Sequence, residues 1–340
     1  MNIPRSPRAT GQVTLSDVAL LAGVSPITVS RALRGERAVA PELVAKVRAA
    51  ADQLGYLPNP AARALASGHS SHVAVLIPML SNAVFVDMLD ALQQTLRQAG
   101  YQALIGITHY DASEEETLLR EQLLHRPAGL IVTGLERNDS SRQLIDQSGV
   151  PCVHLMTTEA PNGAYCVGFS QRDAGRAMTQ HLIAQGYRRI AFAAAQLDPR
   201  ALQRLAGWRS ALQEAGLYDT ALEWQNPAPS SLALGAQMLG QIMRETPPID
   251  AIFFCNDDLA QGALLAAART GIAVPQRIAI AGFNDLKGSD QMVPTLTSMR
   301  TPRAEIGRSA AQMLVALMRG EPVASPILHV DYALQVREST

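Results

Sequence analysis

The stretch DVALLAGVSPITVSRAL, near the start of the chain, holds the side chains whose types and spacing are most suggestive of chemistry. Val29 and Leu33 lie four residues apart and fall on one face of a short helix. The side chains that point elsewhere offer methyl, hydroxyl and guanidinium groups; they belong to Ile27, Thr28, Ser30 and Arg31. Groups of these kinds contact the bases and phosphates of DNA.

A tight turn must bring this helix against the one before it. Thr14 is suited to cap the first helix, and Gly23 can take a positive φ in the turn. Ser25 can then cap the second helix, with Pro26 at its first position, where a missing N–H costs nothing. The pattern predicts a helix-turn-helix, whose second helix lies in a DNA major groove. An αα-hairpin at the edge of a core, with its Ser and Thr side chains solvated, is the alternative.

Reactive side chains elsewhere do not form a catalytic pattern. The chain has no GxGxxG after its first core strand, no GxxxxGK[ST], no GxSxG and no HExxH. Its histidines are scattered and lack metal-ligand spacing, and His154 is expected in the cleft or the core. Asp257 and Asp258 could form a carboxylate pair, but neighbours at a helix start diverge, so N-capping by one of them is favoured. We predict no enzyme activity, no metal and no cofactor.

Length and charge indicate a soluble protein of several domains. The 340 residues are too many for one small core, and 47% of them are hydrophobic and 17% charged. No apolar run is long enough for a bilayer, the first ten residues lack the core of a signal peptide, and three separated cysteines suit a reducing compartment. We therefore expect a cytoplasmic protein, associated with the nucleoid and not with a membrane.

The charge is divided unevenly between the two ends of the chain. Residues 1–68 hold eight Lys or Arg against four Asp or Glu, a net charge of +4. The remainder holds 21 against 26, a net charge of −5. A small basic unit on a mildly acidic body is typical of a DNA-binding head joined to a domain of another function.

Local signals divide the chain into three parts. Residues 1–56 should form the helix-turn-helix domain, completed by a third helix from Pro41 to Leu54 that ends at Gly55. Residues 57–71 should form a linker with a short helical segment, 61–66, which follows Pro58 and Pro60, precedes Gly68 and is too short to be stable alone. Residues 72–340 should form the core.

Apolar runs of strand length alternate with helical segments throughout the core. The expected strands are 73–78, 102–107, 128–134 and 151–156, then 189–195, 251–256 and 277–283. Helices are expected at 85–99, 114–125 and 139–147 in the first series, and at 173–185, 201–215, 231–244, 259–269 and 302–319 in the second. This alternation predicts two α/β lobes with parallel sheets and a ligand cleft at the carboxyl ends of the strands.

Several motifs, in order along the chain, resemble those of the LacI family of bacterial transcription regulators. The matching stretches are VTLSDVALLAGVSPITVSRAL, LGYLPNPAARALASG, VAVLIPMLSNAVF, QRLAGWRSAL, FFCNDDLAQGAL and IAIAGFND. The resemblance covers almost the whole chain. It implies an N-terminal helix-turn-helix and hinge helix that bind DNA. It also implies a periplasmic-binding-protein-like core of two lobes, which binds a small effector and forms the dimer.

The resemblance assigns roles to residues of the head and hinge. Pro26 and Ile27 stand where the family reads bases, although Pro26 replaces a frequent polar or aromatic residue. Leu65 matches the lever that the hinge helix inserts into the minor groove at the operator centre. A plain linker is the alternative for this segment. The expected DNA-binding set is Thr14, Ser25, Pro26, Ile27, Thr28, Ser30, Arg31, Asn59, Ala62 and Leu65.

In the cleft, the resemblance assigns ligand contacts to Arg204 and Asn256, with Asn284 where many members have Asp. Arg204 could clamp a carboxylate or a hydroxyl pair with help from Arg200, or it could be a structural salt-bridge residue. The remaining candidates are polar groups after the first core strand and aromatic rings that could face a sugar. The full expected set is Ser81, Asn82, Phe85, Phe169, Arg200, Arg204, Trp208, Asn256, Phe283 and Asn284.

Within the family, the stretches LIPMLSNAVFVDMLDAL, HLMTTEAP and CVGFSQRDAGRAM are similar to the repressors of gluconate and 2-ketogluconate use. The resemblance therefore implies a repressor that binds a palindromic operator in double-stranded DNA as a homodimer, under control of a sugar-acid effector. A sugar-binding receptor or sugar-processing protein with the same two-lobed core is the alternative, but it would have no use for residues 1–68.

Overall fold

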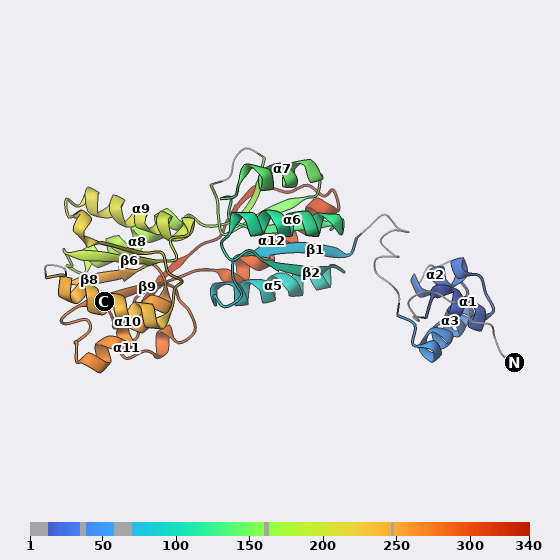
Figure 1. Ribbon diagram of the computed structural model, residues 1–340, viewed down its shortest axis with the longest axis horizontal. Helices are drawn as coiled ribbons and strands as arrows, with labels where there is room; N and C mark the ends of the chain where they lie inside the picture. Colours follow the sequence, from blue (N-terminus) through green and yellow to red (C-terminus); the bar gives the residue numbers. More distant parts are fainter. Residues whose placement is uncertain (1–12, 35–38, 58–69, 160–162, 246–247) are drawn as a thin grey trace. The chain divides into compact units, whose positions relative to one another are not determined.

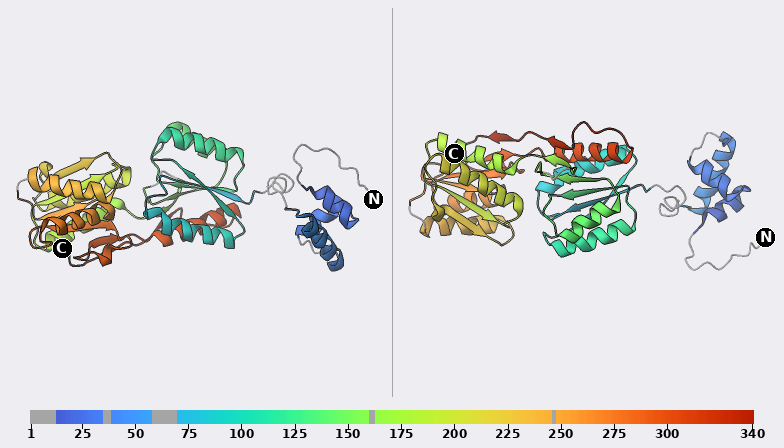
Figure 2. Two further views of the ribbon diagram at one scale, coloured as in Figure 1. Left: turned by 60° about the horizontal axis from the view of Figure 1, so that its bottom comes forward. Right: turned by 90° about the horizontal axis from the view of Figure 1, so that it is seen from above.

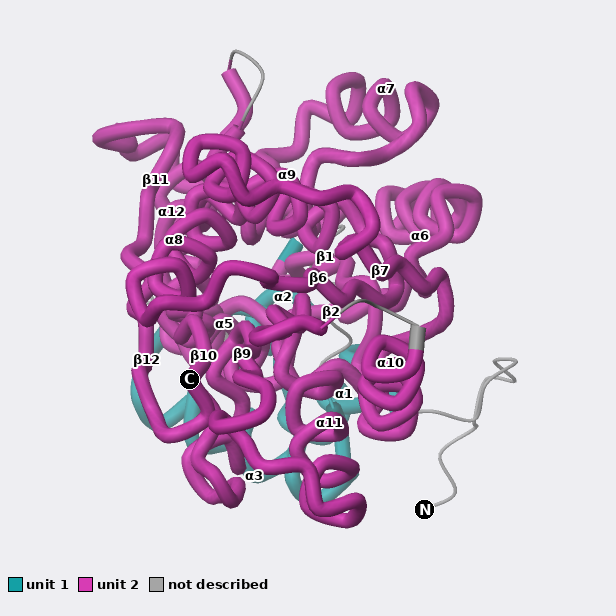
Figure 3. Tube along the Cα trace, turned by 90° about the vertical axis from the view of Figure 1, so that its left-hand side faces the viewer, with its two compact units in different colours: residues 1–70 teal, residues 71–340 magenta. Residues whose placement is uncertain are grey.

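The computed structural model describes residues 13–34, 39–57, 70–159, 163–245 and 248–340. It divides into two compact units, residues 1–70 and 71–340, which are coloured separately in Figure 3. We call the first unit the head and the second the core. No described helix combines the length and apolar character needed to span a bilayer.

The head contains three helices around a small apolar centre. These are α1 (Leu15–Ala22), α2 (Pro26–Arg34) and α3 (Pro41–Leu54). One valine from each helix is completely buried in this centre: Val18 of α1, Val29 of α2 and Val47 of α3. Gly23 has φ of +64° in the turn between α1 and α2, and Gly55 has φ of +63° after α3. The predicted tight turn and the predicted end of the third helix are therefore confirmed.

The core consists of two α/β lobes, each built on one six-stranded sheet (Figure 1). In lobe 1 the sheet order is β11-β5-β4-β3-β1-β2. Its strands are β1 (His72–Ile77), β2 (Gln102–Ile107), β3 (Gly129–Thr133), β4 (Cys152–Leu155), β5 (Tyr165–Gly168) and β11 (Ile327–His329), all paired in parallel. Its helices are α5 (Val84–Gln98), α6 (Ala112–Leu124), α7 (Asp139–Ser148) and α12 (Arg303–Met318).

In lobe 2 the sheet order is β12-β10-β9-β8-β6-β7, and only β12 runs antiparallel to its neighbour. Its strands are β6 (Ile190–Ala195), β7 (Glu223–Asn226), β8 (Ala251–Phe254), β9 (Ala279–Asn284), β10 (Thr297–Arg300) and β12 (Ala333–Gln335). Its helices are α8 (Gln171–Ala184), α9 (Pro199–Glu214), α10 (Leu232–Glu245) and α11 (Asp257–Thr270).

Helices cover both faces of each sheet, as continuous apolar strands require. In lobe 1, Ala74 and Leu130 pack with Leu119 of α6 and Ile145 of α7, while α5 and α12 cover the opposite face. In lobe 2, α8 and α9 lie on one face and α10 and α11 on the other (Figures 1 and 2). The predicted fold class is confirmed in both units.

The chain crosses between the lobes three times. It passes from β5 to α8, from β10 to α12, and from β11 to β12, so α12 and β11 return to lobe 1 late in the sequence. The sequence order had placed the helix at 302–319 with the second series, and this was wrong. The helix packs on α5 and on the first sheet because the chain leaves lobe 2 at residues 301–302.

His154 lies in the core of lobe 1 as a neutral structural residue. Its Nδ1 atom is 3.0 Å from the Gly134 carbonyl oxygen and 3.2 Å from a guanidinium nitrogen of Arg137. Burial, and then the Arg137 charge, lower the pKa of His154 to about 4. Arg137 is itself neutralised by Glu115, whose Oε1 atom is 3.0 Å away. These side chains therefore form a buried polar group within lobe 1.

Two glycines allow α8 and α9 to cross in direct backbone contact. A Cβ atom on Gly207 would lie 2.0 Å from the carbonyl oxygen of Arg172, and one on Gly175 would lie 2.6 Å from that of Arg204. Any side chain at either position would push the helices apart. The crossing therefore sets the depth at which α9 carries Arg204 into the lobe.

We predict that Gly207→Ala lowers the free energy of unfolding of the core by about 1–3 kcal/mol or more, because backbone cannot yield to the new methyl group. Gly240→Ala, in the middle of α10, is the control: the nearest atom to its Cβ would be 3.9 Å away. It should instead stabilise the core by about 0.5–1 kcal/mol, as Ala does in open helices. Denaturant unfolding of both variants checks this; equal effects would contradict the close crossing.

Candidate functional site

A pocket lies between the two lobes, at the carboxyl ends of the strands, where ligands bind in open α/β sheets. Lobe 1 contributes the residues after β1, β2 and β4, and lobe 2 those after β6, β8 and β9. The lining consists of Asn82, Val84, Phe85, Tyr110, Met156, Ala195, Asp198, Arg200, Ala201, Arg204, Cys255, Asn256 and Asn284. The cavity has a volume of about 30 Å³, enough for two or three waters at most.

Arg204 is the most unusual residue of the pocket, because its buried guanidinium has only neutral partners. Its Nε donates to the Gln171 side chain at 2.9 Å and its Nη1 to the Cys255 carbonyl at 2.6 Å. The guanidinium carbon lies 3.9 Å from the centre of the Phe283 ring. No carboxylate of the described residues forms a salt bridge with it. Burial lowers the pKa of Arg204 to about 10.

Arg200 is neutralised, and it connects the lobes. Its Nε donates to Asp198 at 3.1 Å, and its backbone N–H donates to the same carboxylate at 3.0 Å. From lobe 2 its guanidinium reaches the rings of two lobe 1 residues, 5.9 Å from the centre of Phe85 and 5.8 Å from that of Tyr110. Burial raises the pKa of Asp198, but the charges of Arg200 and Arg204 lower it by more. The pKa therefore lies below its ordinary value, and the carboxylate is ionised.

Three asparagines present amide groups at the pocket. The Oδ1 atoms of Asn82 and Asn256 accept backbone N–H groups at the starts of α5 and α11, at 3.1 and 3.2 Å. Asn284 lies at the end of β9 in a left-handed conformation, with φ of +104°. Its side-chain oxygen is buried and has no hydrogen-bond partner among the described residues. A buried amide oxygen in this state favours a hydrogen-bond donor on a ligand.

The capping role expected for Asp257 or Asp258 was wrong. Asn256 caps α11, because its side chain accepts from the Leu259 N–H. Asp257 is completely buried one residue further on, where its carboxylate accepts from the Leu286 N–H at 2.6 Å and from the Ser298 hydroxyl at 2.6 Å. It therefore fixes the segment that follows Asn284.

The structure brings six of the ten expected effector residues together in the pocket: Asn82, Phe85, Arg200, Arg204, Asn256 and Asn284. Ser81 is exposed and lies outside the lining. Phe169 and Phe283 belong to an aromatic cluster at the crossing segments, where Phe169 lies 6.4 Å from Phe283 and 5.7 Å from Tyr332.

Trp208 also lies away from the pocket, in the core of lobe 2. It packs against Phe192 and Tyr218, with ring centres 5.9 Å apart in each pair. The reason is helical geometry. Because α9 begins at the pocket and runs away from it, a residue one turn after Arg204 is about 6 Å deeper in the lobe.

Sequence reasoning missed Tyr110, Met156 and Asp198. Each follows the carboxyl end of a strand, after β2, β4 and β6 respectively, and that position is the signal that could have found them. Tyr110 is the most informative of the three, because burial raises its pKa and it shares the Arg200 guanidinium with Phe85.

The head shows the geometry of a helix-turn-helix. Thr14 is the N-cap residue that precedes α1, and its N–H and hydroxyl both donate to Asp17 at 2.7 Å. Ser25 caps α2, because its hydroxyl accepts from the Thr28 N–H at 3.2 Å. At the start of α2 the side chains of Ser25, Pro26 and Ile27 are exposed, and Arg31 is exposed one turn later. Thr28 and Ser30 are half-buried.

Ile27 is 66% exposed, although it is one of the most apolar residues of the head. Val29, two residues on, is completely buried, so the helix faces the head's core with one side and presents Ile27 on the other. The expected hinge residues Asn59, Ala62 and Leu65 lie outside the described residues, and their roles stay predictions.

A DNA-binding head on a two-lobed core defines a class of bacterial regulatory proteins, and comparison with known proteins agrees. Residues 14–59 match the model for bacterial regulatory proteins of the lacI family, and residues 179–340 match a periplasmic binding protein-like domain. The chain is 53% identical to the HTH-type transcriptional regulator GntR of Pseudomonas aeruginosa, over 99% of this chain and 98% of that protein. The chain belongs to the LacI family. It is a DNA-binding transcription regulator, and its relatives are regulators and not enzymes.

Solved structures are similar over the same regions. The transcription regulator GntR from Chromobacterium violaceum is 48% identical, covering 79% of this chain and 98% of that one, with a TM-score of 0.77. The lac repressor dimer bound to operator and an anti-inducer is 27% identical, covering 96% and 99%, with a TM-score of 0.85.

We predict that Ile27→Ala lowers the preference of the protein for its operator over random DNA by about tenfold, through loss of an apolar base contact. Its stability should change by less than about 0.5 kcal/mol, because the side chain is exposed. Fluorescence anisotropy, with a duplex selected by the wild-type protein and a scrambled duplex, measures the preference. Leu20→Ala is the control, because Leu20 is 65% exposed on α1 and should leave the preference unchanged; an equal loss there would argue against base reading by Ile27.

Proposed function

We propose that this protein is a transcriptional repressor that binds a palindromic operator as a homodimer. We further propose that a sugar acid of the 2-ketogluconate or gluconate type, bound between the lobes, controls its operator affinity. The observation that carries the effector proposal is the buried Arg204 guanidinium with only neutral partners. A buried cation that forms no salt bridge with a carboxylate of the described residues favours an anionic ligand, because pairing would offset its desolvation.

The other polar groups of the pocket suit the hydroxyl groups of a sugar acid. The unpartnered oxygen of Asn284 can accept from a hydroxyl, and the amide nitrogen of Asn256 can donate to one. An Asp at position 284 would bring a negative charge beside a carboxylate ligand, and Asn avoids that repulsion. Phe85 and Tyr110 supply the aromatic wall that sugar rings commonly contact.

The small cavity supports a role in switching. A six-carbon acid is larger than a cavity of about 30 Å³, so it can enter only if the lining side chains move or the lobes separate. The effector would then bind one arrangement of the lobes better than another, which is the condition for shifting a conformational equilibrium.

The relatives support the DNA part of the proposal. The lac repressor structure is that of a dimer bound to operator. A dimer with two-fold symmetry reads a two-fold site, so we expect two heads of this chain to bind two half-sites. Leu65 would act between them, at the operator centre. Such a protein works where DNA is, in the cytoplasm. A sugar-binding receptor, the alternative, gives no role to a folded head with an exposed Ile27.

We predict that 2-ketogluconate or gluconate binds the purified protein and that glucose does not, as measured by calorimetry. Arg204→Gln should weaken binding of the acid by about 10–100-fold, the value of a hydrogen bond to a charged group. Arg204→Lys keeps the charge but loses the two-pronged guanidinium, so its affinity for the acid should lie between those of the wild type and Arg204→Gln.

The matched control is Arg209→Gln on the same helix, because Arg209 pairs with Glu223 and lies outside the pocket. It should bind the acid as the wild type does. Tight binding of a neutral sugar alone would end the sugar-acid proposal, and so would an unchanged affinity in Arg204→Gln with normal unfolding temperature.

Operator binding gives a separate test. Affinity for a palindromic duplex should fall steeply with salt, by about 10³–10⁵-fold between roughly 50 and 200 mM if six to ten phosphates are contacted. The bound acid should lower that affinity at fixed salt. Affinity that is insensitive to salt would favour the receptor alternative instead.

A further inference from the structure

We propose that Arg303 is a positioning residue that clamps the two lobes together outside the pocket, by holding Asp87 of lobe 1 and the end of β9 in lobe 2 at once. We call Asp87, Lys287, Arg303 and the carbonyl groups of Asn284 and Asp285 the interlobe clamp. The inference goes beyond the proposed function, because it does not depend on which effector binds.

The contacts of Arg303 carry the proposal. Arg303 is the first residue of α12, directly after the chain crosses from lobe 2, and its side chain is only 10% exposed. Its Nε and Nη2 atoms donate to one oxygen of Asp87, at 3.3 and 3.0 Å. Its Nη1 donates to the Asn284 carbonyl, and its Nη2 lies 3.5 Å from the Asp285 carbonyl. One rigid guanidinium therefore bridges the lobes.

Asp87 receives charge from both lobes. Besides Arg303, the ammonium of Lys287 in lobe 2 lies 3.6 Å from the second carboxylate oxygen, although Lys287 itself is largely exposed. Burial raises the pKa of Asp87, but its interactions with Arg303 and Lys287 lower the pKa by more, so that it lies below its ordinary value. The carboxylate is thus ionised at neutral pH, and the clamp is charged on both sides.

The clamp holds the same turn of α5 that lines the pocket. Phe85 faces the pocket and Arg200, whereas Asp87, two residues later and about 200° around the helix, faces Arg303. Lobe 2 therefore contacts this turn directly through Arg200 on the pocket side, and through Arg303 of α12 on the other side, which joins Asp87 to the Asn284 and Asp285 carbonyls. Movement of α5 relative to lobe 2 must therefore break the contact of Arg200 with Phe85, the contacts of the interlobe clamp, or both.

The lobe 2 side of the clamp is rigid. Asn284 and Asp285 have φ of +104° and +49°, conformations that only firm surroundings maintain. The Asp285 carboxylate pairs with Arg337 at 2.8 Å, and the next N–H, of Leu286, donates to buried Asp257. This segment cannot follow α5 if the lobes separate, so the Arg303 contacts must change when they do.

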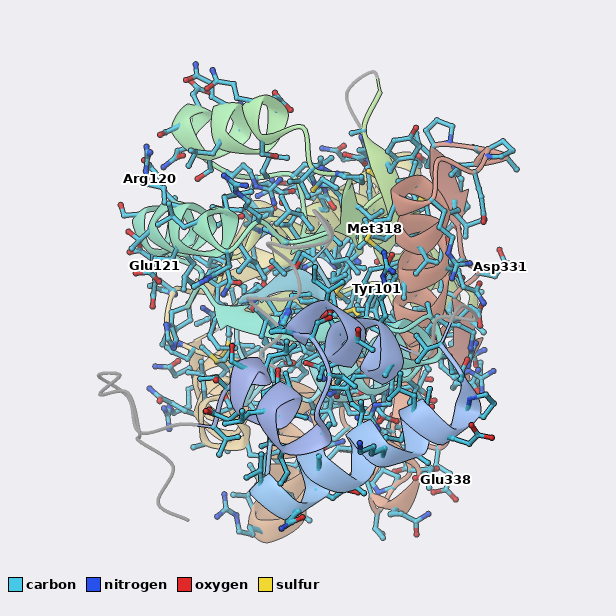
Figure 4. All side chains as sticks on the ribbon, turned by 90° about the vertical axis from the view of Figure 1, so that its right-hand side faces the viewer. Tyr101, Arg120, Glu121, Met318, Asp331 and Glu338 are labelled. Carbon is cyan, nitrogen blue, oxygen red and sulfur yellow. The ribbon has the colours of Figure 1, made fainter. Side chains whose placement is uncertain are left out.

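The test measures the separation of the lobes in the full-length protein without any ligand. Spin labels at Glu121→Cys on α6, which is exposed at the outer edge of the core in Figure 4, and at Gln213→Cys on α9 report the interlobe distance. Cys152→Ser removes the half-buried native thiol in every sample. We expect Asp87→Asn to raise the ratio of separated to closed lobes by about three- to tenfold, and Arg303→Lys to raise it less.

The control is Asp90→Asn, one turn further along α5, because among the described residues Asp90 accepts a hydrogen bond from Gln94 of the same helix and none from lobe 2. It should leave the distance distribution unchanged. The clamp is refuted if Asp87→Asn gives the wild-type distribution, or if Asp90→Asn shifts it as much. The unfolding temperature of each variant shows whether a changed distance distribution reflects lobe opening or loss of the fold. If the Arg303 variant does not fold, the Asp87→Asn result alone decides whether the clamp exists. Failure of sugar acids to bind would leave this result untouched.

Discussion

The arrangement of the core depends on one buried guanidinium, that of Arg204. Its charge is removed from water, its direct contacts are a carbonyl, an amide and the face of Phe283, and the Asp198 carboxylate acts on it only at longer range. The surrounding structure is built to hold it there. The glycines of the α8–α9 crossing set its depth, Asp198 starts its helix at the pocket edge, and Asp257 fixes the loop opposite. The burial of this cation is costly, because no salt bridge with a described carboxylate offsets its desolvation.

The two lobes share this pocket because the chain crosses between them three times. Phe169 and Tyr332 come from two of the crossing segments and pack together with Phe283 of β9. The same aromatic ring that lies under Arg204 therefore also lies in the cluster at the crossings. A ligand that shifts Arg204 acts directly on the residues about which the lobes would turn, with no need for a longer pathway.

The sequence predicted the parts of the structure that bury long apolar runs, such as β1, β6 and β9 with their helices. It missed β5, β7, β10, β11 and β12, which have only three or four residues, and α12 was assigned to the wrong lobe. The residue pattern gives no sign of where the chain crosses between the lobes, because a strand of three or four residues has the same pattern whichever sheet it joins. Spacing alone also could not distinguish Arg204, which lies in the first half of α9 and lines the pocket, from Trp208, which lies one turn further on in the core of lobe 2.

The head has its own apolar centre, formed by the three buried valines and five buried alanines of its described helices. Its recognition helix is capped by Ser25 and held by Val29, and none of these contacts involves the effector pocket. The fold of the head therefore depends on contacts within the head. Under the proposed function, control of DNA binding would act on how two folded heads are paired. The position of α5 relative to lobe 2, which the contacts of Arg200 and Arg303 maintain, would then be the variable through which a ligand and the operator oppose each other.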